Sequence, residues 1–162
     1  MIDIRHTTTD EARTHALGVA LGRCLRAGDV VELIGELGAG KTRLVRGIAQ
    51  GAGHDPDLVS SPTYVLFNEY RSPGAETILH IDAYRIASAD ELHDAGYDHV
   101  SPGAIVLIEW ADRLNGALAG DTLRIEIEHA PSDNDSSRMV RFTCSDALGA
   151  RLAPAINPGC TT

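Results

Sequence analysis

The sequence has little lysine or cysteine and no long apolar segment. Only Lys41 among the 14 basic residues is a lysine. The three cysteines, Cys24, Cys144 and Cys160, are odd in number, widely spaced and without a CxxC pair, which excludes a disulfide framework and argues against a zinc site. No stretch approaches the ~20 apolar residues of a membrane span, and residues 1–6 contain no apolar segment of a secretory signal. We therefore expect a cytoplasmic protein that does not contact membranes.

The size and charge of the chain limit its function further. With 162 residues, of which 43% are hydrophobic, the chain is long enough to bury a core of its own. The net charge of −9 disfavours direct binding to nucleic-acid phosphates, although the same charge also simply keeps a protein soluble. We predict one domain over residues 1–153. A flexible C-terminal tail is expected over residues 154–162, which contain two prolines and a glycine.

Hydrophobic spacing predicts an alternation of helices and strands. Helices are expected at residues 8–27, 42–52 and 89–95, with Thr8 or Thr9 as the cap of the first. Strands are expected at residues 30–34, 64–70, 77–82, 104–109, 122–128 and 139–142. The second and third of these flank a turn-rich segment and suggest an antiparallel hairpin. The pattern as a whole predicts an α/β fold with a mixed β-sheet flanked by helices.

The lone lysine lies in a phosphate-binding motif. Residues 35–42, GELGAGKT, match the P-loop (Walker A) pattern G-x-x-x-x-G-K-[ST] and fall between a predicted strand and a predicted helix. Glycines let successive backbone N–H groups point at one phosphate, and the positive end of the following helix adds to the attraction. Lys41 reaches the outer phosphates, and the Thr42 hydroxyl suits Mg²⁺. The alternative is a glycine-rich turn, but the motif arises by chance with a probability on the order of 0.001 at this composition.

Two carboxylates are candidates for the chemistry beside the phosphates. Asp82 and Glu109 each close a predicted buried strand, and ligands collect at the carboxyl ends of parallel strands. The alternative for each is a solvated strand end or a helix cap. His80 lies two residues before Asp82 and therefore shares its face of the strand, near the expected metal.

Several further motifs occur in order along the chain and resemble the TsaE family, formerly YjeE. They are GELGAGKT at 35–42, VRG at 45–47, SPT at 61–63, NEY at 68–70, HIDAYR at 80–85 and IEW at 108–110. The resemblance covers roughly residues 9–145 and implies a P-loop NTPase-like three-layer fold. It also implies that the chain binds ATP and Mg²⁺ and hydrolyses ATP slowly unless it is partnered. Members of the family act with the TsaB–TsaD complex, in which TsaD transfers a threonylcarbamoyl group to adenosine 37 of tRNAs that read ANN codons. The chain would then meet tRNA only indirectly.

The resemblance also implies roles for individual residues. Lys41, Asp82 and Glu109 are expected to be catalytic, and Thr42, Glu109 and Asp82 are expected to hold Mg²⁺. Nucleotide contacts are expected from Glu11, Thr14, Leu37, Gly38, Ala39, Gly40, Lys41, Thr42 and Arg138. Ser61, Pro62 and Thr63 resemble a switch-like loop that senses the γ-phosphate. Trp110 is expected near the nucleotide, with plain core packing as the alternative.

Two other functions fit the phosphate-binding motif alone. The first is a P-loop kinase of a small metabolite, but the sequence shows no obvious arginine-bearing lid. The second is a nucleotide-dependent binding module that barely hydrolyses ATP, because phosphoryl transfer depends mostly on positioning and electrostatics and fails when one group is missing. The resemblance, rather than the motif, favours the ATPase.

Overall fold

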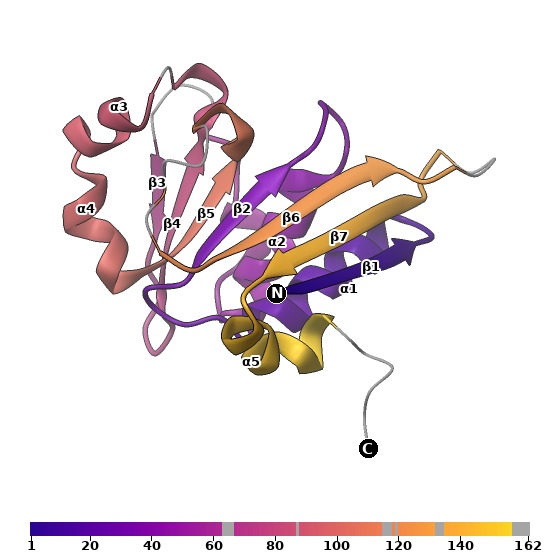
Figure 1. Ribbon diagram of the computed structural model, residues 1–162. Coiled ribbons are helices and arrows are strands. Elements are labelled where there is room, and N and C mark those ends of the chain that lie inside the picture. The colour runs from indigo at the N-terminus through magenta and orange to yellow at the C-terminus, as the bar shows by residue number, and fades with distance from the viewer. Residues whose placement is uncertain (63–66, 87, 115–117, 119, 132–134, 157–162) are drawn as a thin grey trace.

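The protein is built on a seven-stranded mixed β-sheet with helices on both faces (Figure 1). The computed structural model describes residues 1–62, 67–86, 88–114, 118, 120–131 and 135–156. The strands lie in the order β1-β7-β6-β2-β5-β4-β3. The four strands β4, β5, β2 and β6 are parallel, whereas β3, β7 and β1 pair antiparallel. Their bounds are Ile2–Thr8 (β1), Val30–Ile34 (β2), Phe67–Tyr70 (β3), Thr77–Asp82 (β4), Ala104–Glu109 (β5), Thr122–His129 (β6) and Arg138–Cys144 (β7).

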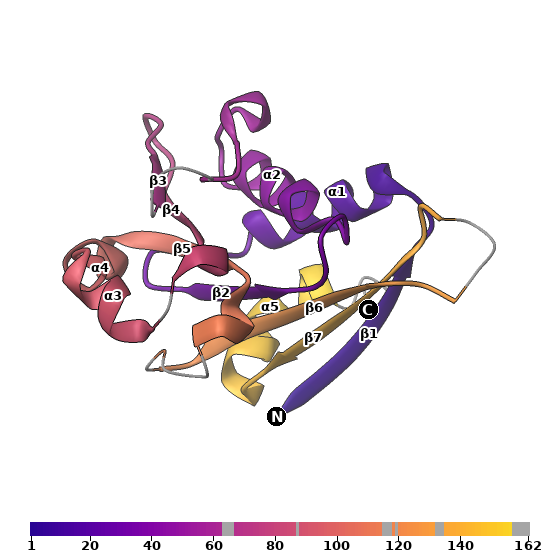
Figure 2. The same ribbon diagram turned by 90° about the horizontal axis from the view of Figure 1, so that it is seen from above.

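Helices cover the sheet from two sides and give it two apolar cores. α1 (Glu11–Gly22), α2 (Lys41–Gly51) and α5 (Asp146–Ile156) pack on one face. α3 (Ala89–Asp94) and α4 (Tyr97–Val100) pack toward the other, and α1 and α2 lie side by side (Figure 2). The 3₁₀ turns are η1 (Pro56–Leu58), η2 (Ala83–Arg85), η3 (Ser101–Gly103) and η4 (Ala111–Leu114). The predicted P-loop NTPase-like three-layer fold with a mixed sheet is therefore confirmed.

Most predicted elements are present, with small shifts at their ends. β3 and β4 form the predicted antiparallel hairpin, in which Asn68 pairs with His80. Residues 64–66 of the predicted strand at 64–70 lie outside the described residues. β5 is buried along its whole length, as expected of a parallel strand covered on both faces. Across the described part of the chain, no helix has the length and apolar character needed to cross a membrane.

The N-terminal prediction was wrong at both ends of the first helix. Residues 2–8 form strand β1 against β7, so Thr8 belongs to a strand and Asp10 caps the helix instead. The Asp10 carboxylate accepts a hydrogen bond from the backbone N–H of Arg13 at 2.8 Å. α1 ends at Gly22 rather than at residue 27, because the chain tightens there into a turn in which the Cys24 N–H reaches the Leu21 carbonyl.

The C-terminal prediction was wrong for residues 154–156. α5 continues to Ile156, and both Ala155 and Ile156 are buried in the core. Leu148, Leu152, Ala155 and Ile156 recur at helical spacing and form an apolar stripe, which offsets the hydrogen bond that Pro154 cannot donate. The expected tail therefore does not include residues 154–156, and residues 157–162, for which it stays a prediction, lie outside the described residues.

Four glycines let the backbones of α1 and α2 pack in close contact: Gly18 and Gly22 on α1, and Gly47 and Gly51 on α2. A methyl group at Gly22 would overlap the Ile48 carbonyl oxygen, which is backbone and cannot rotate away. We expect Gly22→Ala to destabilise the fold by about 2–3 kcal/mol, the cost of overpacking. Gly103→Ala is the control, because a methyl group there meets nothing within 4 Å. Urea unfolding measures both variants, and equal midpoints for them would contradict the close packing.

Candidate functional site

The loop between β2 and α2 has the shape of a phosphate cradle. Gly38 (φ 80°) and Gly40 (φ 108°) adopt left-handed backbone conformations that favour glycine. The Leu44 N–H already bonds to the Gly40 carbonyl at 3.0 Å, so the helix starts directly after the loop. The first N–H groups of a helix have no carbonyl partner within it and can bind an anion, and in the loop the Ala39 N–H donates to the Glu36 carbonyl at 3.1 Å.

Lys41 places its amine at the mouth of this loop. The Nζ atom donates to the carbonyl oxygens of Gly35 at 2.5 Å and Glu36 at 2.9 Å. It also lies 3.9 Å from the centroid of the Trp110 ring, a cation–π contact. Burial lowers the pKa of Lys41 below its ordinary value, opposed by the negative charges of Glu109, Asp82 and Asp112.

Thr42 and Glu109 meet beside the lysine. The Thr42 hydroxyl lies 3.1 and 3.2 Å from the two carboxylate oxygens of Glu109, to which it donates. Glu109 ends β5 and is only 3% exposed. Its Oε1 atom also lies 2.9 Å from Nε2 of His80, a fully buried side chain on β4. His80 therefore contacts Glu109, the carboxylate that the sequence analysis assigns to Mg²⁺.

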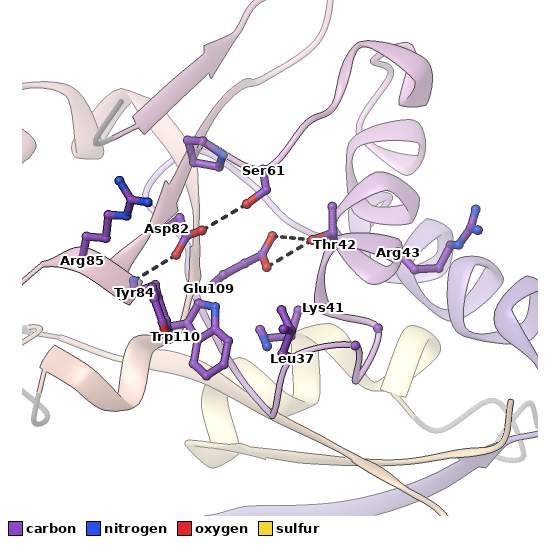
Figure 3. Close-up of a pocket in the computed structure, with 13 residues that line it drawn as sticks. Leu37, Lys41, Thr42, Arg43, Ser61, Asp82, Tyr84, Arg85, Glu109 and Trp110 are labelled. Carbon is purple, nitrogen blue, oxygen red and sulfur yellow. Dashed lines mark hydrogen bonds between the residues drawn. The ribbon is translucent and has the colours of Figure 1, made fainter. Parts of the chain in front are cut away.

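Asp82 closes β4 in register with Glu109 on β5. Its Oδ2 atom accepts a hydrogen bond from the Ser61 hydroxyl at 3.1 Å, and its Oδ1 atom accepts one from the Tyr84 N–H at 2.9 Å. Asp82 thus caps the 3₁₀ turn η2, the alternative considered from the sequence, while its carboxylate still faces the site (Figure 3).

These groups surround one cavity of about 730 Å³ (Figure 3). Its lining includes most of the predicted site residues, from the loop, from the ends of β4 and β5, and from the segment after η1. The lining consists of Leu37, Gly38, Gly40, Lys41, Thr42, Arg43, Ser61, Pro62, Asp82, Tyr84, Arg85, Glu109 and Trp110. Thr63, the third residue of the predicted switch-like loop, lies outside the described residues.

Four predicted nucleotide contacts do not line the cavity: Glu11, Thr14, Ala39 and Arg138. Arg138 supports the loop instead, since its guanidinium donates to the carbonyl oxygens of Ala39 at 2.8 Å and Gly38 at 3.3 Å. Ala39 is buried, and Thr14 is buried behind Gly40 with its hydroxyl 2.8 Å from that of Thr8. Glu11 forms a 2.5 Å ion pair with Arg43, and it is Arg43 that lines the cavity.

Sequence reasoning assigned no role to three residues of the lining: Arg43, Tyr84 and Arg85. The Tyr84 ring lies 5.0 Å from the Trp110 ring, and the Arg113 guanidinium stacks 4.6 Å over it. Arg43 directly follows the motif, and Tyr84 and Arg85 follow Asp82 at the carboxyl end of β4, where ligands collect. These positions in the sequence could have predicted that the three residues line the site.

The donor set suits magnesium better than a metal held by the protein alone. Among the described residues, no three His, Cys, Asp or Glu side chains come together as a metal-binding group. Mg²⁺ in nucleotide sites takes one or two carboxylates and completes its shell with water and substrate phosphates. The adjacent Thr42 hydroxyl and Glu109 carboxylate fit that requirement, and Asp82 lines the same cavity.

A mixed sheet with four parallel strands, a glycine loop that opens a helix and a lysine at the mouth of that loop define a P-loop protein of the α/β class. A family model for the threonylcarbamoyl adenosine biosynthesis protein TsaE matches residues 8–140. The chain belongs to the TsaE family, as its motifs predicted.

Individual relatives agree with the family model. The "tRNA threonylcarbamoyladenosine biosynthesis protein TsaE" of Streptomyces coelicolor is 39% identical over 141 residues, covering 86% of this chain and 93% of that protein. The protein of the same name from Bacillus subtilis is 34% identical and covers 93% and 90% of the two chains. A crystal structure of B. subtilis YdiB superposes with a TM-score of 0.76 at 26% identity, over 99% of this chain and 97% of that one.

Proposed function

We propose that this chain binds ATP with Mg²⁺, hydrolyses it slowly, and supports N6-threonylcarbamoylation of adenosine 37 in tRNAs that read ANN codons. It acts with TsaB and TsaD, and TsaD rather than this chain is the transferase. The observation that carries the proposal is the convergence of Lys41, Thr42 and Glu109 on one cavity behind a glycine loop. Membership in the TsaE family supplies the pathway.

ATP binding follows from the loop. Backbone N–H groups of residues 37–42 would surround the phosphates, with that of Ala39 leaving the Glu36 carbonyl. The Lys41 amine would exchange its two carbonyl contacts for the β- and γ-phosphate oxygens. Phosphate contacts are stronger than those carbonyl contacts because both partners are charged. Arg138 keeps the loop carbonyls turned away from the phosphates by holding those of Gly38 and Ala39.

Hydrolysis needs the carboxylates at the strand ends. Thr42 and Glu109 would hold Mg²⁺, and Asp82 would assist the metal or orient the attacking water. When bound, the metal neutralises charge on the β- and γ-phosphates. Asp82 is itself held in place by Ser61, so its acceptor oxygen is fixed relative to the cavity wall. Ser61 and Pro62 line the cavity, and together with Thr63 they would serve as the switch-like loop that senses the γ-phosphate.

The partners follow from the family and from the charge. A net charge of −9 disfavours direct contact with tRNA phosphates, so recruitment through protein contacts is the simpler route. The related proteins from S. coelicolor and B. subtilis carry the tRNA modification name, which favours this function over a P-loop kinase of a small metabolite.

The test is phosphate release from Mg²⁺–ATP by the chain alone and with purified TsaB–TsaD. We expect a weak basal rate of phosphate release that rises about tenfold or more with the complex. In related phosphoryl transfers, a catalytic group supplied by a partner protein raises the rate by far more than tenfold. TsaB alone is the control and should not stimulate. A rate that is indifferent to the complex would contradict the proposal and lead to a screen of metabolites as phosphate acceptors.

A further inference from the structure

A series of polar contacts connects Glu109 to residues 60–62, the segment whose Ser61 and Pro62 also line the cavity. His80 contacts Glu109 Oε1 through Nε2 at 2.9 Å, and its Nδ1 atom lies 3.3 Å from the Tyr70 hydroxyl. That hydroxyl lies 3.0 Å from the Ser60 carbonyl oxygen. Ser60 directly precedes Ser61, which bonds to Asp82 in the cavity. The contacts therefore connect both carboxylates of the site to one loop.

The contacts in this series join each polar group to a partner. The Glu109 carboxylate meets Nε2 of His80, and Nδ1 of the same ring meets the Tyr70 hydroxyl. The Tyr70 hydroxyl has one proton and two acceptors within reach, Nδ1 of His80 and the Ser60 carbonyl. The Ser60 carbonyl already accepts from the Asn68 side-chain amide at 3.2 Å. A carbonyl oxygen accepts two hydrogen bonds, so the Tyr70 hydroxyl donates to Ser60 at 3.0 Å while its oxygen contacts Nδ1 of His80 at 3.3 Å.

The sheet fixes these residues on the face that carries α2. His80 pairs with Asn68 of β3 on one side and with Leu107 of β5 on the other. Tyr70 and Glu109 each lie two residues further along those strands, so both reach the same face as His80. The Tyr70 and His80 rings lie 6.1 Å apart, and His80 is fully buried.

We propose that Tyr70 is a positioning residue for Glu109, acting through His80, and that it ties the Glu109 carboxylate to the loop at Ser60. The proposal rests on the proposed function, because Glu109 is there assigned to Mg²⁺. Tyr70 does not line the cavity, and its hydroxyl meets His80 rather than Glu109. Its hydroxyl bonds to Ser60 and contacts the imidazole, and the imidazole holds the carboxylate beside Thr42. Movement of the Ser60–Pro62 segment is thereby transmitted to Glu109.

The test is Tyr70→Phe, which removes only the hydroxyl. The chain has one tryptophan, Trp110, directly after Glu109, so its fluorescence reports on Mg²⁺ titrated into the complex with a non-hydrolysable ATP analogue. We expect the half-saturating Mg²⁺ concentration to rise about tenfold and kcat to fall about tenfold, as happens when a group behind a metal ligand is lost. Affinity for the analogue without Mg²⁺ should stay within about twofold, since the phosphate loop is untouched.

The matched control is Tyr97→Phe. Tyr97 is half-buried in α4, among residues that pack on the other face of the sheet. This variant loses the same hydroxyl group and should bind Mg²⁺ as the wild type does. If Tyr70→Phe keeps the wild-type Mg²⁺ dependence, or if Tyr97→Phe shifts it equally, the positioning role is overturned.

A second measurement separates this inference from the proposed function. In the nucleotide-free protein, the ¹⁵N signal of His80 Nδ1 should shift in Tyr70→Phe, which removes the hydroxyl that this atom contacts, and should stay unchanged in Tyr97→Phe. An unchanged His80 spectrum overturns the role of Tyr70 whether or not the chain hydrolyses ATP. A changed spectrum in a protein that never hydrolyses ATP supports the hydrogen-bond relay and overturns the proposed function alone.

Discussion

Replacing Lys41 with alanine should abolish productive ATP binding. Lys41 is the only lysine of the chain, and its amine is already positioned at the mouth of the loop by two carbonyl oxygens and the Trp110 ring. Charge-assisted hydrogen bonds contribute about 1.5–3 kcal/mol each. Losing two of them to the phosphates lowers affinity by about 100-fold or more. Calorimetric titration with Mg²⁺–ATP measures the change.

A surface arginine provides the matched control for the lysine variant. Arg71→Ala also removes one positive charge, but its side chain is 74% exposed and pairs with Glu69 on the hairpin. Such exposed pairs contribute little, so its ATP affinity should match that of the wild type. If Lys41→Ala also keeps wild-type affinity, the assignment of residues 35–42 to phosphate binding is wrong. If both variants lose affinity equally, general charge rather than the loop attracts the nucleotide.

The parts of the site that the sequence predicts are those whose conformation depends on residues close by in the sequence. The loop at 35–42 is one continuous segment whose conformation depends on its own glycines and on the helix that follows. Asp82 and Glu109 each follow a short buried strand, and parallel strands bring their carboxyl ends together. Local pattern and one topological rule were therefore enough to place Lys41, Thr42, Asp82 and Glu109 in one cavity.

The parts that the sequence did not predict depend on contacts between distant residues. β1 forms because Ile2–Thr8 pairs with Arg138–Cys144, nearly the whole chain away, and no turn signal joins them. Arg138 was expected at the nucleotide, yet it bonds to the loop carbonyls instead, a choice that depends on the register of β7. Tyr70 reaches His80 only because β3 and β4 pair in one register.

Loss of the Glu109 carboxylate should reduce hydrolysis far more than binding. The phosphate loop and Lys41 remain in Glu109→Ala, so we expect ATP affinity without Mg²⁺ to change by no more than about threefold. The kcat should fall about 100-fold or more, because a metal ligand contributes most as charge develops on the transferred group. Single-turnover hydrolysis at saturating ATP separates this effect from binding.

Two further variants make the Glu109 result interpretable. Truncation to alanine leaves Nε2 of His80 buried without its acceptor, which destabilises the fold by about 1–3 kcal/mol. Glu109→Gln keeps an oxygen for His80 and for Thr42 while removing the charge, so it should fold normally and still lose hydrolysis. Glu128→Ala, an exposed carboxylate on β6, is the control for net charge. Wild-type hydrolysis by Glu109→Gln would show that the carboxylate charge is not needed. The metal would then be held elsewhere in the cavity, with Asp82 as the remaining carboxylate of its lining.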